Sequence, residues 1–104
     1  MKRVAFTMKL KPGCEAEYKR RHDEIWPELS REIKAAGISD YTICLHPDTL
    51  VLYASQKVED EGDADSLSSN PIVRRWWSWM ADLMETNGDD SPVCESLIEV
   101  FHMD

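Results

Sequence analysis

The chain opens with large apolar residues alternating with smaller or polar ones. The large residues are Val4, Phe6, Met8 and Leu10. A period of two is that of a β-strand with one strongly apolar face. The first ten residues therefore predict a strand, which Pro12-Gly13 brings to an end.

A second pattern follows, in which apolar residues recur at spacings of three and four from Tyr18 to Ala36. This period predicts an amphipathic helix that ends at Gly37. Pro27 lies inside it, lacks a backbone donor and clashes with the preceding turn. We therefore expect a kink or a break in the helix near Trp26.

The middle of the chain is rich in strand-forming residues. Segments 38–46 and 50–58 flank Pro47-Asp48-Thr49, which predicts a β-hairpin. The acidic, serine-rich stretch 59–69 suits a surface connection with a short helical turn. Its acidic residues are most simply a solvated surface run.

Asn70-Pro71 supplies an N-cap and a first-turn proline for a second helix that continues over 72–84. Residues 85–92 have turn chemistry, and 93–103 return to strand-like composition. The predicted order is β-α-β-β-α-β, which is an α+β chain of the ferredoxin-like type with an antiparallel sheet and both helices on one face.

Length and charge narrow the class of protein. The 104 residues suit one domain over 1–104, and 42% apolar with 31% charged residues suits a folded globular chain. Two helices cannot cover both faces of the sheet, so we expect a face-to-face homodimer. A net charge of −8 disfavours nucleic acid, and no apolar run reaches the length of a membrane span.

Cofactor and metal motifs are missing from the sequence. No glycine pair has the spacing of a nucleotide-binding loop, and His22, His46 and His102 are too far apart for a helical metal motif. We expect no cofactor and no metal. The three cysteines are odd in number and widely spaced, which indicates reduced thiols in a cytoplasmic protein.

Tyr18 and His22 are the clearest candidates for chemistry. A spacing of four places both side chains on the helical face directed at the sheet. The simpler interpretation is a core histidine bonded to a backbone carbonyl. The functional interpretation is a general acid, because a partly buried imidazole titrates near neutral pH.

The run Arg74-Arg-Trp-Trp-Ser-Trp79 is the most unusual in the chain. Three tryptophans within four residues cannot all point to one side of a helix. They are either core anchors and dimer contacts or the wall of a sugar pocket, since indole faces stack on sugar C–H edges. Tyr41 and Tyr53 lie on the hairpin, where either phenol could reach a ligand or simply pack.

Three segments together resemble the L-rhamnose mutarotase family. They are residues 17–29 with the pattern Tyr-x-x-x-His-x-x-x-Trp-Pro, residues 75–84 with Trp-Trp, and residues 91–101. The resemblance implies a dimeric α/β-barrel isomerase without cofactor, which interconverts the α and β anomers of L-rhamnose in the cytoplasm. It gives His22 the role of proton donor.

The resemblance also implies substrate contacts at Tyr18, Tyr41, Trp76 and Trp77. Cys14, Cys44, Cys94 and Trp79 depart from the family pattern outside these positions. His22 would protonate the ring oxygen while a base or water takes the anomeric proton. Tyr18 is a poor base with its ordinary pKa near 10. Two other functions remain open: a cofactor-poor monooxygenase or haem-handling protein on the same scaffold, and a non-catalytic sugar-binding module.

Overall fold

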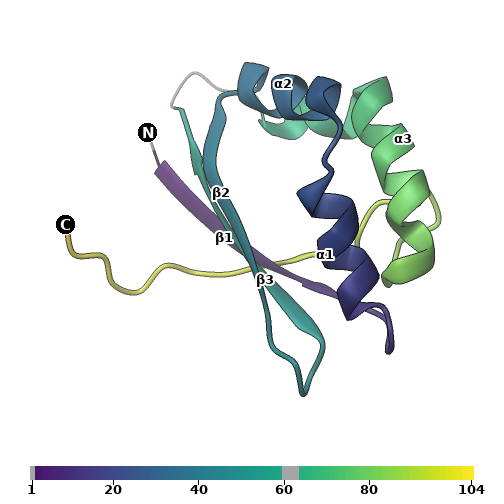
Figure 1. Cartoon of the computed structure of the whole chain (residues 1–104). Coiled ribbons are helices and arrows are strands. Elements are labelled where there is room, and N and C mark those ends of the chain that lie inside the picture. Colours follow the sequence, from purple (N-terminus) through teal and green to yellow (C-terminus); the bar gives the residue numbers. More distant parts are fainter. Residues whose placement is uncertain (1, 60–63) are drawn as a thin grey trace.

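The computed structural model describes residues 2–59 and 64–104, and the side chains of all of these except 64–66. Its elements are β1 (Lys2–Lys9), α1 (Glu15–Asp23), α2 (Pro27–Ala35), β2 (Ile38–Leu45), β3 (Val51–Val58), the 3₁₀ helix η1 (Ala64–Ser69), α3 (Pro71–Met80), the 3₁₀ helix η2 (Ala81–Leu83) and β4 (Glu95–Ser96). The strands form one antiparallel sheet in the order β2-β3-β1-β4, and the helices lie on one face of it (Figure 1). The predicted α+β class is confirmed.

The expected break near Trp26 divides the first helical region into α1 and α2. The backbone of Trp26 is extended, at φ −60° and ψ 128°, and Pro27 occupies the first helical position of α2. A proline there loses no helical hydrogen bond, because the first amides of a helix have no partner within it. The proline that would have disrupted one long helix therefore starts a second one.

The predicted hairpin is confirmed as β2 and β3, and it contains a bulge. Ser39 pairs with Lys57 and Thr42 pairs with Ser55, so both Asp40 and Tyr41 lie opposite Gln56. The extra residue shifts the alternation of side chains along β2. As a result Ile38 before the bulge and Tyr41 after it both face the helices, although their numbers differ in parity.

Helix α3 begins as predicted but is shorter than the expected 72–84. The Asn70 side chain accepts hydrogen bonds from the amides of Ile72 and Val73, at 2.9 and 3.3 Å. The α-helix ends at Met80 and tightens into η2. The chain then lies beside the end of β1, where Leu10 and Met84 form a bridge, and this pairing replaces the last helical turn.

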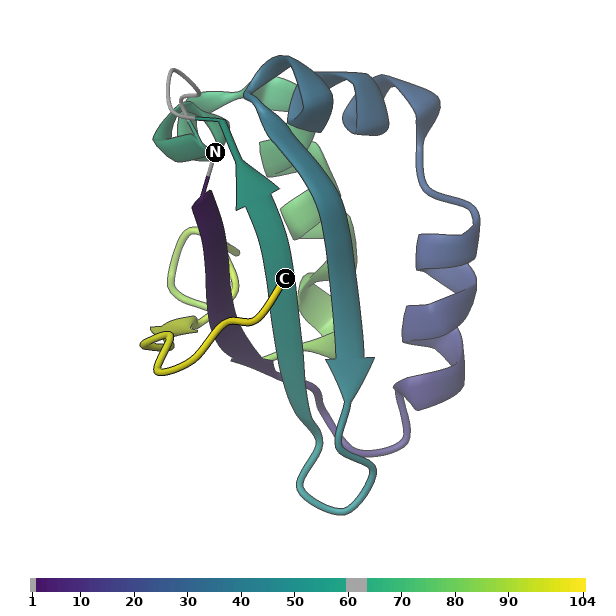
Figure 2. The ribbon, with the colours of Figure 1, turned by 90° about the vertical axis from the view of Figure 1, so that its left-hand side faces the viewer.

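The last predicted strand, 93–103, is mostly wrong for the single chain. Only Glu95–Ser96 pairs with β1, and the remainder extends away from the sheet on the side opposite the helices (Figures 1 and 2). Ile98 and Val100 are 88% and 92% exposed. In this C-terminal arm, residues 97–104, the one backbone hydrogen bond to the sheet among the described residues runs from the Leu97 amide to the Ala5 carbonyl, at 2.9 Å. Strand-forming residues need a neighbouring strand, and beyond Leu97 the described part of the chain offers none.

The core lies between the sheet and the helices. Its fully buried members are Leu10 and Leu52, and Leu29 and Met80 pack with them. The predicted helical turn within 59–69 is present as η1, while residues 60–63 lie outside the described part. In the described portion of the chain, none of the helices has the length and apolar character needed to cross a bilayer.

Candidate functional site

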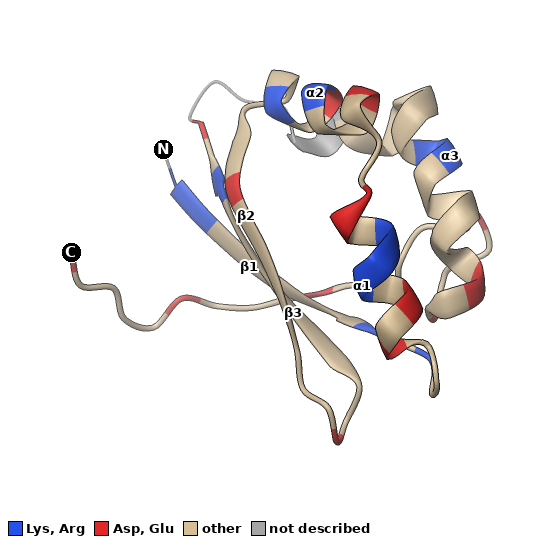
Figure 3. Cartoon of the chain, in the orientation of Figure 1, with Lys and Arg blue, Asp and Glu red and all other residues tan. Residues whose placement is uncertain are grey.

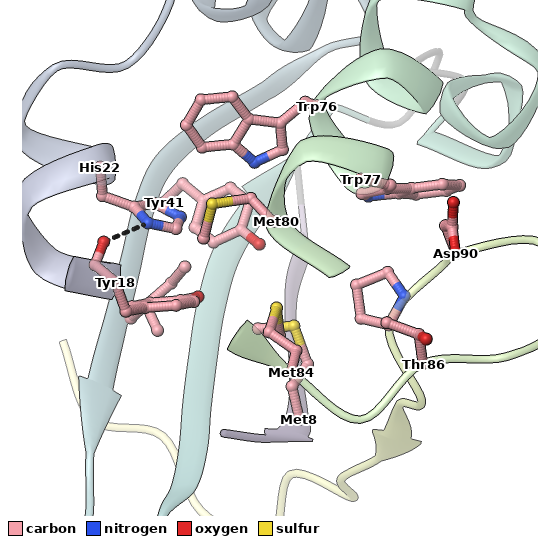
Figure 4. Close-up of a pocket in the computed structure, with 12 residues that line it drawn as sticks. Met8, Tyr18, His22, Tyr41, Trp76, Trp77, Met80, Met84, Thr86 and Asp90 are labelled. Atoms are coloured by element: carbon pink, nitrogen blue, oxygen red, sulfur yellow. Dashed lines mark hydrogen bonds between the residues drawn. The ribbon is translucent and has the colours of Figure 1, made fainter. Parts of the chain in front are cut away.

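The five residues to which the family resemblance gives roles come together around one cavity. Tyr18 and His22 come from α1, Tyr41 from β2, and Trp76 and Trp77 from α3 (Figure 4). The cavity has a volume of about 70 Å³, and the same five side chains also line a wider groove of about 1460 Å³ between the helices and the sheet. The helical spacing in α1 and the bulge in β2 are what aim these groups at one another.

His22 is held in a defined orientation by its own helix. Its Nδ1 lies 3.0 Å from the carbonyl oxygen of Tyr18, one turn earlier (Figure 4). A carbonyl only accepts, so Nδ1 carries a hydrogen and donates it, which leaves Nε2 for exchange with a ligand. Burial lowers the pKa of His22 below its usual value, so the ring is neutral at neutral pH. His22 thus makes the backbone hydrogen bond expected of a core histidine and also lines the cavity.

The two tyrosines of the cavity remain protonated. Tyr18 is only 8% exposed, and burial raises its pKa above the usual range for a phenol. Burial likewise raises the pKa of Tyr41 to about 12. Neither phenol is a base at neutral pH, which agrees with the expectation for Tyr18. Both hydroxyl groups are available to donate hydrogen bonds to a ligand oxygen.

The tryptophans divide between the cavity and its support. Trp76 is 7% exposed and meets the His22 ring edge-on, with 5.4 Å between centroids and an angle of 90°. Trp77 is half-buried and lines the cavity beside it. Trp79 instead stacks on Trp26, with 5.5 Å between centroids. Trp79 also contacts Trp76, with 5.3 Å between centroids, so these two indoles share one side of α3. Trp77 takes no part in these ring contacts, which agrees with the prediction that the three indoles do not share one side.

Arg21 connects α1 to the end of α3, directly behind His22. Its guanidinium donates to Glu17 at 2.7 Å, to the Trp79 carbonyl at 2.7 Å and to Asp82 at 3.0 Å. It also lies 4.7 Å from the centroid of the Trp79 ring. This role of Arg21 could not be predicted from the sequence, because its partners on α3 and η2 are distant along the chain.

The remaining wall of the cavity combines sulfur and aliphatic groups with one polar edge. Its members are Met8, Ile43, Met80, Met84, Thr86, Asp90 and Pro92. The strand pattern indicated that Met8 faces inward, but nothing in the sequence indicated that the turn-forming stretch 86–92 closes the cavity. Tyr53 does not contribute, because it is 45% exposed while its neighbours Leu52 and Ala54 are buried toward the helices. The suggestion that Tyr53 could reach a ligand between sheet and helices is therefore wrong.

The described residues contain no group of three or more His, Cys, Asp or Glu side chains placed to hold a metal ion.

Comparison with known proteins gives a consistent result over the whole chain. The L-rhamnose mutarotase family profile matches residues 3–103. An L-rhamnose mutarotase of Bacteroides thetaiotaomicron is 54% identical over 104 residues, covering all of both chains. One from Flavobacterium johnsoniae is 53% identical over 102 residues, covering 98% of this chain and 95% of its own. The crystal structure of the L-rhamnose mutarotase from Formosa agariphila superposes with a TM-score of 0.93 at 45% identity, covering all of both chains.

Proposed function

The chain belongs to the L-rhamnose mutarotase family, and on that premise we propose that His22 and the surrounding cavity interconvert the α and β anomers of L-rhamnose. The protein is a carbohydrate isomerase. The observation that carries the role of His22 is the orientation of its ring, with Nδ1 bonded to the Tyr18 carbonyl and Nε2 left for a ligand. The names of the relatives favour this function over a monooxygenase, a haem-handling protein or a non-catalytic sugar-binding module.

The cavity wall suits a deoxysugar. The indoles of Trp76 and Trp77 offer apolar faces to the C–H edges and the methyl group of the sugar. The phenols of Tyr18 and Tyr41 are protonated and donate to its oxygen atoms. We therefore assign these four residues to substrate binding, with His22 as the residue that exchanges protons.

Anomer exchange requires the hemiacetal ring to open, the aldehyde to rotate and the ring to close on its other face. Opening moves one proton from the anomeric hydroxyl to the ring oxygen as the C1–O5 bond breaks. Neutral His22 accepts the anomeric proton at Nε2 and, now an imidazolium, donates a proton to the ring oxygen. Closure reverses these transfers, and the imidazole ends neutral. One residue is thus both the predicted proton donor and the base that the sequence left unidentified.

The relay has to supply only a modest acceleration of anomer exchange, because the reaction also proceeds unaided in water. General acid–base help is typically worth about 10²- to 10⁴-fold. The tyrosine hydroxyl groups add to it by stabilising negative charge that develops on the oxygen atoms.

Saturation-transfer NMR on equilibrated L-rhamnose tests the assignment, since it measures exchange between the two anomeric protons directly. We expect the wild-type protein to accelerate exchange and His22→Ala to lose about two or more orders of magnitude of that acceleration. His46→Ala is the matched control, because His46 lies at the exposed end of the β2–β3 hairpin. No acceleration by folded wild-type protein would remove L-rhamnose as the substrate.

We also infer a homodimer built as an α/β barrel from two ferredoxin-like sheets. The strand order β2-β3-β1-β4 with helices on one side supports this, because the opposite side is left for a partner. Charged residues concentrate on the helices, while the strands and the C-terminal arm carry few (Figure 3). The exposed apolar side chains of that arm are Leu97, Ile98, Val100, Phe101 and Met103. A second copy would bury them and give the arm a strand to pair with.

Sedimentation equilibrium tests this assembly. The full chain should be dimeric at micromolar concentration, and a chain that ends at Ser96 should be monomeric. A stable full-length monomer would overturn the proposal. We place the protein in the cytoplasm, which is supported by Cys14, Cys44 and Cys94 all being free thiols.

A further inference from the structure

Gln56 is a largely buried residue in the wall of the groove that contains His22. It lies on β3 between Ala54 and Val58, which are 1% and 5% exposed, and its own exposed fraction is 8%. Alternate residues of a strand point to the same face, so Gln56 projects toward the helices with these two neighbours. It lines the same groove as Tyr18, Tyr41 and Trp76.

No hydrogen bond joins the Gln56 amide to another described residue, and no buried side-chain nitrogen or oxygen in the described part of the chain lacks a partner, so the amide atoms themselves reach the open groove. A glutamine side chain carries two donor hydrogens and an acceptor oxygen. Its surroundings in the groove include apolar side chains such as Ile38, Leu67 and Val73. Without a ligand, water hydrates this amide from the groove, and a ligand that displaces that water has to replace its hydrogen bonds with polar groups of its own.

The β-bulge places Gln56 next to Tyr41. Asp40 and Tyr41 together lie opposite Gln56 across the β2–β3 pair, and opposite residues of neighbouring strands are in side-chain contact range. Tyr41 lines the cavity with His22. A ligand against Tyr41 is therefore within reach of the Gln56 amide.

We propose that Gln56 is a further substrate-binding residue, whose amide both donates to and accepts from hydroxyl groups of the sugar that lies against Tyr41. Each sugar hydroxyl is itself both a donor and an acceptor, which matches the two ends of the amide. A few placed polar groups in a mostly apolar site are what fix the orientation of a small ligand. The inference rests on the proposed anomer exchange.

Gln56→Met tests the proposal, because it keeps the length of the side chain and removes its hydrogen-bonding groups. The KM for L-rhamnose should rise about tenfold, since the sugar loses its partner. The melting temperature of the sugar-free protein should stay within about 2 °C of the wild-type value, since the amide has no protein partner to lose. A purely structural glutamine would instead lower the melting temperature when replaced.

Arg31→Met is the control, because Arg31 on α2 is exposed and lines neither the cavity nor the groove. It should change neither KM nor kcat. Gln56→Leu repeats the test should the methionine variant fold poorly. Monodeoxy derivatives of L-rhamnose then identify the contact: the derivative lacking the hydroxyl bound by Gln56 should have nearly the same KM with wild type and variant.

If the wild-type protein is active and Gln56→Met has the same KM for L-rhamnose, the assignment of Gln56 is overturned. The proposed anomer exchange is unaffected by that result. A fall in both melting temperature and affinity would also overturn the assignment, by making Gln56 structural. Inactive wild-type protein would instead remove the proposed function on which the inference rests.

Discussion

Arg21 offers a direct test of how helix α1 is held against α3. Its side chain is only 11% exposed, and it bonds to the carboxylates of Glu17 and Asp82 and to a backbone carbonyl. In Arg21→Ala the two carboxylates, which are 36% and 65% exposed, regain water and contribute little to the cost. The charged bond to the carbonyl of Trp79 is worth about 1.5 to 3 kcal/mol, and the contact with its ring about 0.5 to 1. We expect a loss of about 2 to 4 kcal/mol in the free energy of unfolding.

Urea unfolding at fixed protein concentration measures this loss, and Arg20→Ala is the matched control. Arg20 makes ion pairs that are equally short, 2.6 Å to Glu17 and 2.8 Å to Glu24, but its side chain is 54% exposed. Replacing it should leave the unfolding midpoint nearly unchanged, because water replaces its partners. Equal losses for the two variants would refute the reasoning that burial, and not the number of ion pairs, decides the cost.

Three further predictions concern pH, capping and the core. Burial lowers the pKa of His22 below 6.5, and the proposed relay starts from the neutral ring. The catalysed rate should therefore be flat above pH 7 and fall as the pH drops through that pKa, and a rate that rises toward acid in stopped-flow polarimetry would contradict this. Asn70→Ala should destabilise the protein by about 1 kcal/mol in urea, and Asn70→Ser should restore most of it, since serine also caps; equal losses in both would exclude capping. Leu10→Ala removes a side chain that is 1% exposed and should cost about 2 to 5 kcal/mol in calorimetry, whereas a cost under 1 would mean that the core is not packed there.

Features set by neighbouring residues could be predicted from the sequence. Pro27 forces the break between α1 and α2 through its own covalent structure, and Asn70 caps α3 through amides two and three residues away. The meeting of Tyr18 and His22 follows from one helical turn. Each of these needs only a short segment of chain, which is why the pattern alone was sufficient.

Features that depend on distant segments could not be predicted in this way. The stretch 93–103 has the composition of a strand, but a strand exists only where another strand accepts it. Tyr41 and Tyr53 were equal candidates, because nothing in the sequence marked the bulge at Asp40 that sets the phase of β2. The approach of Asp90 to the cavity and of Asp82 to Arg21 likewise joins residues far apart in the chain.

The hydrogen bond from His22 to the carbonyl of Tyr18 orients the His22 ring with a group from the same helical turn. Many catalytic histidines take their tautomer from a carboxylate on another segment and lose it when that side chain changes. Here the orienting group is main chain, which no substitution deletes. The tautomer and orientation of His22 therefore depend on the backbone of α1 alone, and substitutions elsewhere in the cavity wall should leave both unchanged.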